Sequence, residues 1–147
     1  MIKSYSKINL FLKIIKKNKN GLHNIQSSVM LLNLYDQISI KKINTNQDEI
    51  KFIGKFKKNI NNKKNTISKS LHILRKQGLI RKSENYKIVI NKKIPVFAGL
   101  GGGTSNAVFL IKYFLKNKIN EKLLSIFEKK IGSDFRLFIH KHSFQKS

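Results

Sequence analysis

The sequence predicts a layered α+β or α/β domain, in which strands near the N-terminus are followed by a mixture of helices and strands. Three observations predict this class. Residues 7–15 alternate between polar and apolar side chains, as a half-buried strand does. Apolar residues recur at helical spacing in residues 65–77 and again in residues 107–115. A chain of 147 residues with 40% hydrophobic content has the length of one ordinary domain and can bury a core.

The first part of the chain is predicted to consist of strands. The alternation in residues 7–15 puts two sets of side chains on opposite faces: apolar Ile8, Leu10, Leu12 and Ile14, and polar Lys7, Asn9 and Lys13. A turn around Gly21 follows. Residues 28–43 predict one or two strands around Asp36, and residues 49–54 predict another.

The second part is predicted to contain three helices. Asn65 or Thr66 caps the first, which runs to Gln77 and ends at Gly78. The other predicted elements are a strand at 86–90, helices at 107–115 and 119–131, and a final strand at 135–140.

The formal net charge of +24 suggests a polyanionic partner such as nucleic acid. Composition bias is the alternative, because Lys, Asn and Ile share A/T-rich codons. The chain has 28 lysines but only three arginines, and arginine is the residue that bidentate phosphate recognition and base readout prefer. We therefore favour composition bias, and we expect any nucleic-acid binding to be unspecific.

The chain has no cysteine, which excludes a disulfide framework and a thiolate metal site. This absence suits a reducing compartment, so we expect a cytoplasmic protein. The longest apolar run, at residues 107–111, is too short for a transmembrane helix, and lysines interrupt the N-terminal region in a way that is untypical of a signal peptide. No membrane partner is expected.

Residues 95–108, PVFAGLGGGTSNAV, contain four of the eight glycines, after the only proline and before an apolar helix. Glycines let the backbone approach phosphate oxygens, and the helix that follows adds N–H donors at its positive end. Thr104 and Ser105 could contact phosphate or Mg²⁺. The spacing fits neither the Walker A pattern nor the dinucleotide fingerprint. A linker or tight turn is the alternative, which the flanking proline and apolar helix disfavour.

This stretch resembles the phosphate-binding motif of the GHMP kinases, and five further segments are similar to motifs of that family, in family order over essentially the whole chain. They are SKINLFLKI at 6–14, GLHNIQS at 21–27, NLYDQISI at 33–40, NTISKS at 65–70 and IGSDFRLFI at 131–139. The branch that it most resembles acts in the non-mevalonate isoprenoid pathway. The resemblance implies that residues 1–147 form the family's N-terminal ATP-binding domain, which is similar to domain 2 of a small-subunit ribosomal protein. It also implies ATP- and Mg²⁺-dependent phosphorylation of a small-molecule hydroxyl.

The resemblance also implies roles for single residues. Asp134 would be the general base that accepts the proton of the substrate hydroxyl, and Lys7 would lie beside it and favour its ionised form. Asn9 and His23 would contact the substrate, with His23 at a cytosine edge. Taken alone, Asp134 could merely cap a turn and His23 could be an ordinary loop histidine. The ATP site would comprise Asn65 near the adenine, and Pro95, Ala98, Gly99, Leu100, Gly101, Gly102, Gly103, Thr104 and Ser105, with Ser105 also on Mg²⁺.

Three features depart from the family pattern. Phe135 and Arg136 follow the aspartate, where the family usually has a small apolar residue and a proline, so a bulky cation could block the site. Leu22 replaces an aromatic residue that stacks on cytosine. The chain has about half the family length and would lack the C-terminal domain that closes the cleft. We therefore expect exposed apolar surface, and either a separate C-terminal half or an inactive remnant of a kinase gene.

Overall fold

The computed structural model describes residues 1–17, 23–116, 118–139 and 144–146. Its elements are β1 (Ile2–Lys17), β2 (His23–Ile43), β3 (Glu49–Ile53), α1 (Thr66–Lys76), β4 (Asn85–Asn91), α2 (Gly102–Leu115), α3 (Glu121–Ile131), the 3₁₀ helix η1 (Ser133–Phe138) and β5 (Phe144–Lys146). The strand order is β1-β2-β4-β3, with β5 paired to β2. β3 and β4 pair in parallel and the other neighbours are antiparallel, so the sheet is mixed. The predicted α+β class is confirmed.

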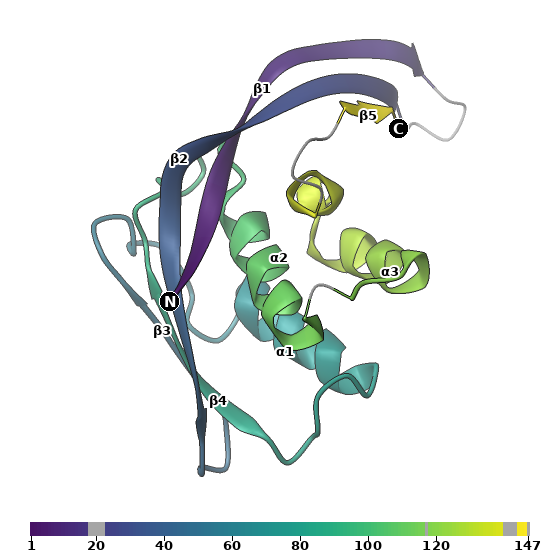
Figure 1. The fold of residues 1–147 in the computed structure, drawn as a ribbon. Helices are drawn as coiled ribbons and strands as arrows, with labels where there is room; N and C mark the ends of the chain where they lie inside the picture. Colours follow the sequence, from purple (N-terminus) through teal and green to yellow (C-terminus); the bar gives the residue numbers. More distant parts are fainter. Residues whose placement is uncertain (18–22, 117, 140–143, 147) are drawn as a thin grey trace.

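The helices lie on one side of the sheet (Figure 1). The core between them contains large, fully buried side chains from both layers: Ile38, Ile88 and Ile90 of the sheet, and Ile67, Leu71, Leu74, Leu110 and Ile111 of α1 and α2. Burial of this apolar surface is the main force that holds the two layers together. In the described ranges, none of the helices is long and apolar enough to cross a membrane.

β1 and β2 form a long pair that curves over η1 (Figure 1). The register shifts after Tyr5, after Asn9 and after Ile14, and such bulges increase the local bend and twist of a pair. The region predicted as one or two strands at 28–43 is one continuous part of β2.

The predicted faces of β1 are only partly correct. Lys7 and Asn9 share one side, as predicted, since Lys7 Nζ donates to Asn9 Oδ1. Leu10 is 58% exposed, however, and Lys7 is buried. The bulge explains the difference for Leu10, because Asn9 pairs with Val29 and Phe11 with Ser28, which leaves Leu10 as the extra residue. The side chains of Leu12 and Ile14 lie outside the described part of the chain.

α1 begins and ends as predicted. Asn65 Oδ1 accepts the N–H groups of Ile67 and Ser68, and Ser68 Oγ in turn accepts the N–H of Asn65. This reciprocal capping box satisfies donors that a helix start leaves unpaired. Gly78, at φ +68°, follows the C-cap residue Gln77.

Residues 133–138 form η1 and not the strand predicted for residues 135–140. Phe135 N–H donates to Gly132 O, and Ile139 N–H donates to Arg136 O. Phe135 and Phe138 are three residues apart, so both lie on one face of a 3₁₀ helix, where they are buried. The aspartate segment is therefore helical, and the final strand is β5 instead.

Candidate functional site

The glycine-rich stretch connects β4 to α2. The sign of φ alternates along this stretch. Phe97, Gly99 and Gly101 have φ values of +60°, +72° and +68°, whereas the residues between them do not have positive φ. Alternation of this kind turns successive N–H groups toward a concave side, where an anion can bind. Lys7 N–H donates to Leu100 O at 3.0 Å, which ties the loop to β1.

The N-terminus of α2 has no side-chain cap. Gly101 occupies the cap position, whereas Asn residues cap α1 and α3 through their side chains. The N–H of Ser105 is bonded within the helix, to Gly101 O, and a helix start leaves the N–H groups before this point without helical acceptors. The first turn has no acidic residue. These N–H groups and the positive end of the helix dipole thus favour an anion.

A pocket of about 390 Å³ lies in front of this loop, which is the size of a small-molecule site. Residues 95–104 form one wall, and residues 59–66 contribute the other. Nine of the ten residues predicted for the ATP site line it: Asn65, Pro95, Ala98, Gly99, Leu100, Gly101, Gly102, Gly103 and Thr104. The side chain of Asn65 also caps α1 and donates to Asn61 O and Asn62 O, so it fixes the shape of this wall.

Ser105 does not line the pocket, in contrast to the prediction. It is fully buried, and its Oγ donates to Tyr5 O at 2.6 Å and lies 2.8 Å from Ser4 Oγ. Consecutive residues point about 100° apart around a helix. Because α2 begins at Gly102, Ser105 faces β1, and Thr104 is the hydroxyl residue that lines the pocket.

The predicted pair of Lys7 and Asp134 is brought together from opposite ends of the chain. Lys7 Nζ lies 3.3 Å from Asp134 Oδ2 and 3.0 Å from Asn9 Oδ1. The Lys7 side chain is 5% exposed and that of Asp134 is 38% exposed, so a buried cation holds a carboxylate that reaches solvent. A carboxylate in this position is accessible to a substrate hydroxyl.

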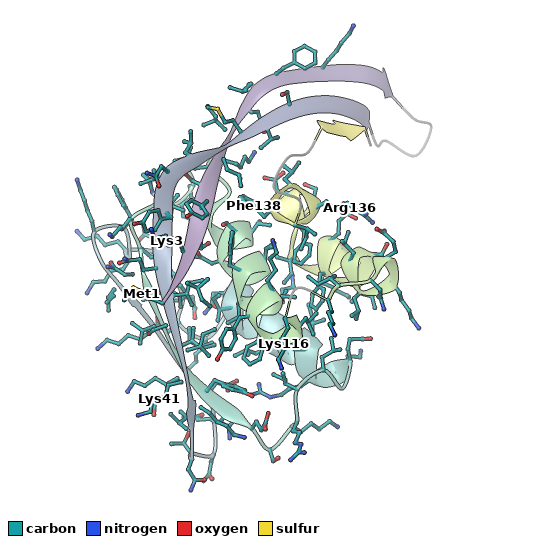
Figure 2. All side chains as sticks on the ribbon, in the orientation of Figure 1. Met1, Lys3, Lys41, Lys116, Arg136 and Phe138 are labelled. Carbon is teal, nitrogen blue, oxygen red and sulfur yellow. The ribbon has the colours of Figure 1, made fainter. Side chains whose placement is uncertain are left out.

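Gly101 is the point where the loop, β1 and η1 meet. A Cβ atom at this position would lie 2.8 Å from Phe138 Cζ and 3.2 Å from Lys7 Cγ. Figure 2 shows Phe138 on the inner side of η1, toward α2 and the β1–β2 pair. The backbone of the loop therefore packs directly against the elements that carry Lys7 and Asp134.

Gly101→Ala is expected to destabilise the fold by about 2 kcal/mol, since a left-handed backbone costs an L-residue about 1–2 kcal/mol and the added methyl group meets the Phe138 ring. Urea unfolding measures this change. Gly103→Ala is the matched control, because the nearest atom to its Cβ is at 3.8 Å and alanine favours a helix. Equal effects of the two substitutions would contradict the close packing at Gly101.

The sequence suggested that Arg136 could block the site, but its guanidinium bonds to α3 and not to Asp134. Its Nε donates to Glu128 Oε2 at 2.8 Å and its Nη1 donates to Glu121 Oε2 at 3.1 Å, both on α3. The bond to Glu128 raises the pKa of the Arg136 guanidinium, which stays charged. Figure 2 shows Arg136 on the α3 side of η1. The arginine thus fastens η1 to α3.

Sequence reasoning missed a buried polar cluster, here named the Asp36 cluster (Asp36, Lys92 and Asn106). The Asp36 carboxylate accepts from Lys92 Nζ, from Asn106 Nδ2 at 3.0 Å, and from the N–H groups of Lys93 and Ile94. Lys92 and Asn106 also line the pocket, and Asn106 Oδ1 is buried without a hydrogen-bond partner. The signal in the sequence was Asp36 itself, an acidic residue within a strand that is otherwise largely apolar, since a buried charge needs a partner.

His23 begins β2 and pairs with Lys17. The side chain of His23, together with Gly21 and Leu22, lies outside the described part of the chain. Its predicted contact with a cytosine stays a prediction.

Residues 65–140 match the family model described as the GHMP kinases N terminal domain. The chain belongs to the GHMP kinase family. This GHMP kinase chain is 47% identical over 118 residues to 4-diphosphocytidyl-2-C-methyl-D-erythritol kinase of Pelagibacter ubique (strain HTCC1062). The aligned region covers 80% of this chain and 41% of that protein. It is 36% identical over 147 residues to the protein of the same name from Thermosipho melanesiensis, over 95% of this chain and 48% of that protein.

A crystal structure of 4-(cytidine 5'-diphospho)-2C-methyl-D-erythritol kinase has the same fold as this GHMP kinase chain. The TM-score is 0.68 at 22% sequence identity, over 94% of this chain and 48% of that chain. The predicted family fold is therefore confirmed. The chain spans about half the length of the curated relatives it matches.

Proposed function

We propose that this chain is the ATP-binding half of a kinase that transfers the γ-phosphate of ATP to the 2-hydroxyl of 4-diphosphocytidyl-2-C-methyl-D-erythritol, in isoprenoid precursor biosynthesis. The Lys7–Asp134 pair beside the uncapped start of α2 is the observation that carries this proposal. The names of the relatives support the choice of substrate. Residues 1–147 form the N-terminal domain of this kinase.

The pocket suits a nucleoside triphosphate because its two ends differ in chemistry. Backbone N–H groups at the start of α2 bind the phosphates, and the ammonium of buried Lys92, paired with Asp36, lies next to Gly102. The lining also includes apolar Phe52 and Ile60, which suit the uncharged adenosine.

Mg²⁺ fits this site through few protein ligands. It usually keeps several waters and binds one or two protein oxygens together with the phosphates of a substrate. Thr104 has a hydroxyl on the pocket, and a Cβ at Gly132, two residues before Asp134, would lie 3.4 Å from Thr104 Oγ1. Thr104 is therefore the candidate protein ligand. Bound Mg²⁺ would neutralise charge on the transferring phosphoryl group.

In the proposed reaction, Asp134 accepts the proton of the substrate hydroxyl. Lys7 holds the carboxylate in place and adds positive charge near the transferring group. Asn9 fixes the Lys7 ammonium through its Oδ1 and is exposed enough to contact the substrate. The remaining contribution is positioning, because phosphoryl transfer depends on placement and electrostatic stabilisation.

Thr104→Val is expected to raise the Mg²⁺ concentration needed for half-maximal turnover by about tenfold and to leave the unfolding free energy nearly unchanged, since one ligand oxygen is lost from an accessible position. Ser105→Ala is expected to do the opposite: it removes two buried hydrogen bonds and destabilises the fold by about 1–2 kcal/mol. Mg²⁺ titrations of turnover and urea unfolding measure the two effects. If Ser105→Ala raised the Mg²⁺ requirement and Thr104→Val destabilised the fold, Ser105 would be the metal ligand instead.

A second half completes the substrate site in this proposal. The described surface exposes Leu10, Phe11 and Met30 along β1 and β2. Under this pair lies a hollow of about 370 Å³, lined by Tyr5, Leu31, Leu32, Asn33, Phe109, Lys112 and Phe138. Apolar surface of this kind is typical of an interface. A C-terminal half, for which the longer relatives have the length, is the occupant that we propose for this surface.

The test is ATP-dependent phosphorylation of 4-diphosphocytidyl-2-C-methyl-D-erythritol, followed by ADP release. The purified chain is assayed alone and mixed with a polypeptide that corresponds to the second half of the Pelagibacter ubique relative. Turnover that requires both polypeptides supports the whole proposal, and turnover by the chain alone removes the need for a partner. A folded mixture that binds ATP but transfers no phosphate would contradict the proposed reaction.

A further inference from the structure

Phe97 combines two unfavourable features at the edge of the pocket. Its φ of +60° is a left-handed backbone conformation, which is an outlier for a bulky residue. Its side chain is also 92% exposed to solvent, although an aromatic ring gains free energy when it leaves water. Strained backbone of this kind persists only where the surrounding structure imposes it, and such residues cluster at ligand sites.

The described part of the chain has three non-glycine residues with positive φ, and two of them line this pocket. Phe97 belongs to the wall of residues 95–104, and Asn59, at φ +66°, belongs to the other wall. The third, Lys116, is the C-cap of α2, where a left-handed residue is common. The unusual backbone is thus concentrated where the two walls face the ligand.

The place of Phe97 along the pocket indicates which part of a ligand it meets. In the proposed site the phosphates lie at Gly102 and Gly103, at the helix start, where N–H groups have no acceptor within the helix. Phe97 lies before these glycines in the loop, and the pocket lining near it includes apolar Pro95 and Val96. A nucleotide with its phosphates on α2 can therefore extend its base along this wall toward Phe97.

We propose that Phe97 binds the nucleobase: its exposed ring stacks on the base of the bound nucleotide and covers the apolar end of the pocket. This inference rests on the proposed function of the pocket as a nucleotide site. Stacking uses the π-face that every base has, so it tolerates different bases. Phe97 therefore contributes affinity for the nucleoside part and little discrimination between ATP and GTP.

The test measures binding without catalysis, by calorimetry with ATP, GTP and inorganic tripolyphosphate. Phe97→Ala is expected to weaken ATP and GTP binding about 5- to 150-fold, the range of one base–aromatic stack. Tripolyphosphate binding stays the same, because it uses only the α2 end. Tyr113→Ala is the matched control: this aromatic residue is 52% exposed on α2, outside the pocket, and its loss leaves all three affinities unchanged.

Two further variants separate stacking from a structural role. Phe97→Gly relieves the left-handed backbone, so the melting temperature of the variant rises while its ATP affinity falls. If Phe97 had only a structural role, the melting temperature and the ATP affinity would both fall. Phe97→Trp introduces the only tryptophan of the chain, and its fluorescence is expected to change on addition of ATP and not of tripolyphosphate.

The outcomes distinguish the two proposals. If the unmodified chain binds ATP and Phe97→Ala binds it equally well, the role of Phe97 is overturned and the nucleotide site remains. If the unmodified chain binds ATP no better than tripolyphosphate, the base is not held, and the stacking role is also overturned. If it binds neither, both the nucleotide site and the inference are overturned.

Discussion

Asp134→Asn is expected to lower the turnover rate of phosphoryl transfer by about 10²–10⁴-fold, the usual contribution of a general base. The amide keeps the size of the carboxylate but cannot accept the proton of the substrate hydroxyl. ATP affinity is expected to change little, because Asp134 does not line the nucleotide pocket. Calorimetry of ATP binding and an ADP-release assay measure the two quantities separately.

Lys7→Met tests the other member of the pair. Methionine keeps most of the apolar chain that packs against Gly101, so the fold is retained while the ammonium beside Asp134 is lost. Asp48→Asn is the matched control: Asp48 pairs with Arg75 through two short hydrogen bonds, and neither residue belongs to the pocket lining. The Asp48→Asn variant is expected to lose stability but to keep the turnover rate per folded molecule. Full activity of Asp134→Asn would contradict its role as the base.

The parts of the fold that were predicted correctly depend on local chemistry. The boundaries of α1 follow from Asn65, Gly78 and the apolar spacing between them, all within one short segment. Residues 135–140 were predicted wrongly because Phe135, Leu137 and Phe138 are typical of a strand, whereas their burial against neighbouring helices selects a 3₁₀ turn. Tertiary packing thus decides where local preference is ambiguous.

The sequence motifs named the loop residues and the Lys7–Asp134 pair of the candidate site. The structure places most of the loop residues around one pocket and brings Lys7 and Asp134 together, and their roles stay predictions. Thr104 and Ser105 were both named as hydroxyl candidates, and the sequence could not decide which of them faces the pocket, because a shift of one residue in the start of α2 rotates each side chain by about 100°. Lys92 could not be singled out either: it is one of 28 lysines, and only its contact with Asp36 distinguishes it.

Asp36→Leu is expected to destabilise the fold by about 3–5 kcal/mol, a large part of the roughly 5–15 kcal/mol that stabilises a typical domain. The substitution leaves the Lys92 ammonium buried without its anion, and it also removes the acceptor for the N–H groups of Lys93 and Ile94. Urea unfolding at neutral pH, monitored by circular dichroism, measures the loss.

The double variant Asp36→Leu with Lys92→Met shows which loss dominates. It removes the unpaired charge, so stability is expected to recover in part, while the unpaired N–H groups still cost about 1–3 kcal/mol each. These N–H groups lie just before Pro95, where the glycine-rich loop begins, so the double variant should still bind ATP more weakly than the unmodified chain. No recovery of stability would contradict the buried charge as the main cause, and would place the contribution of Asp36 in its bonds to the loop backbone.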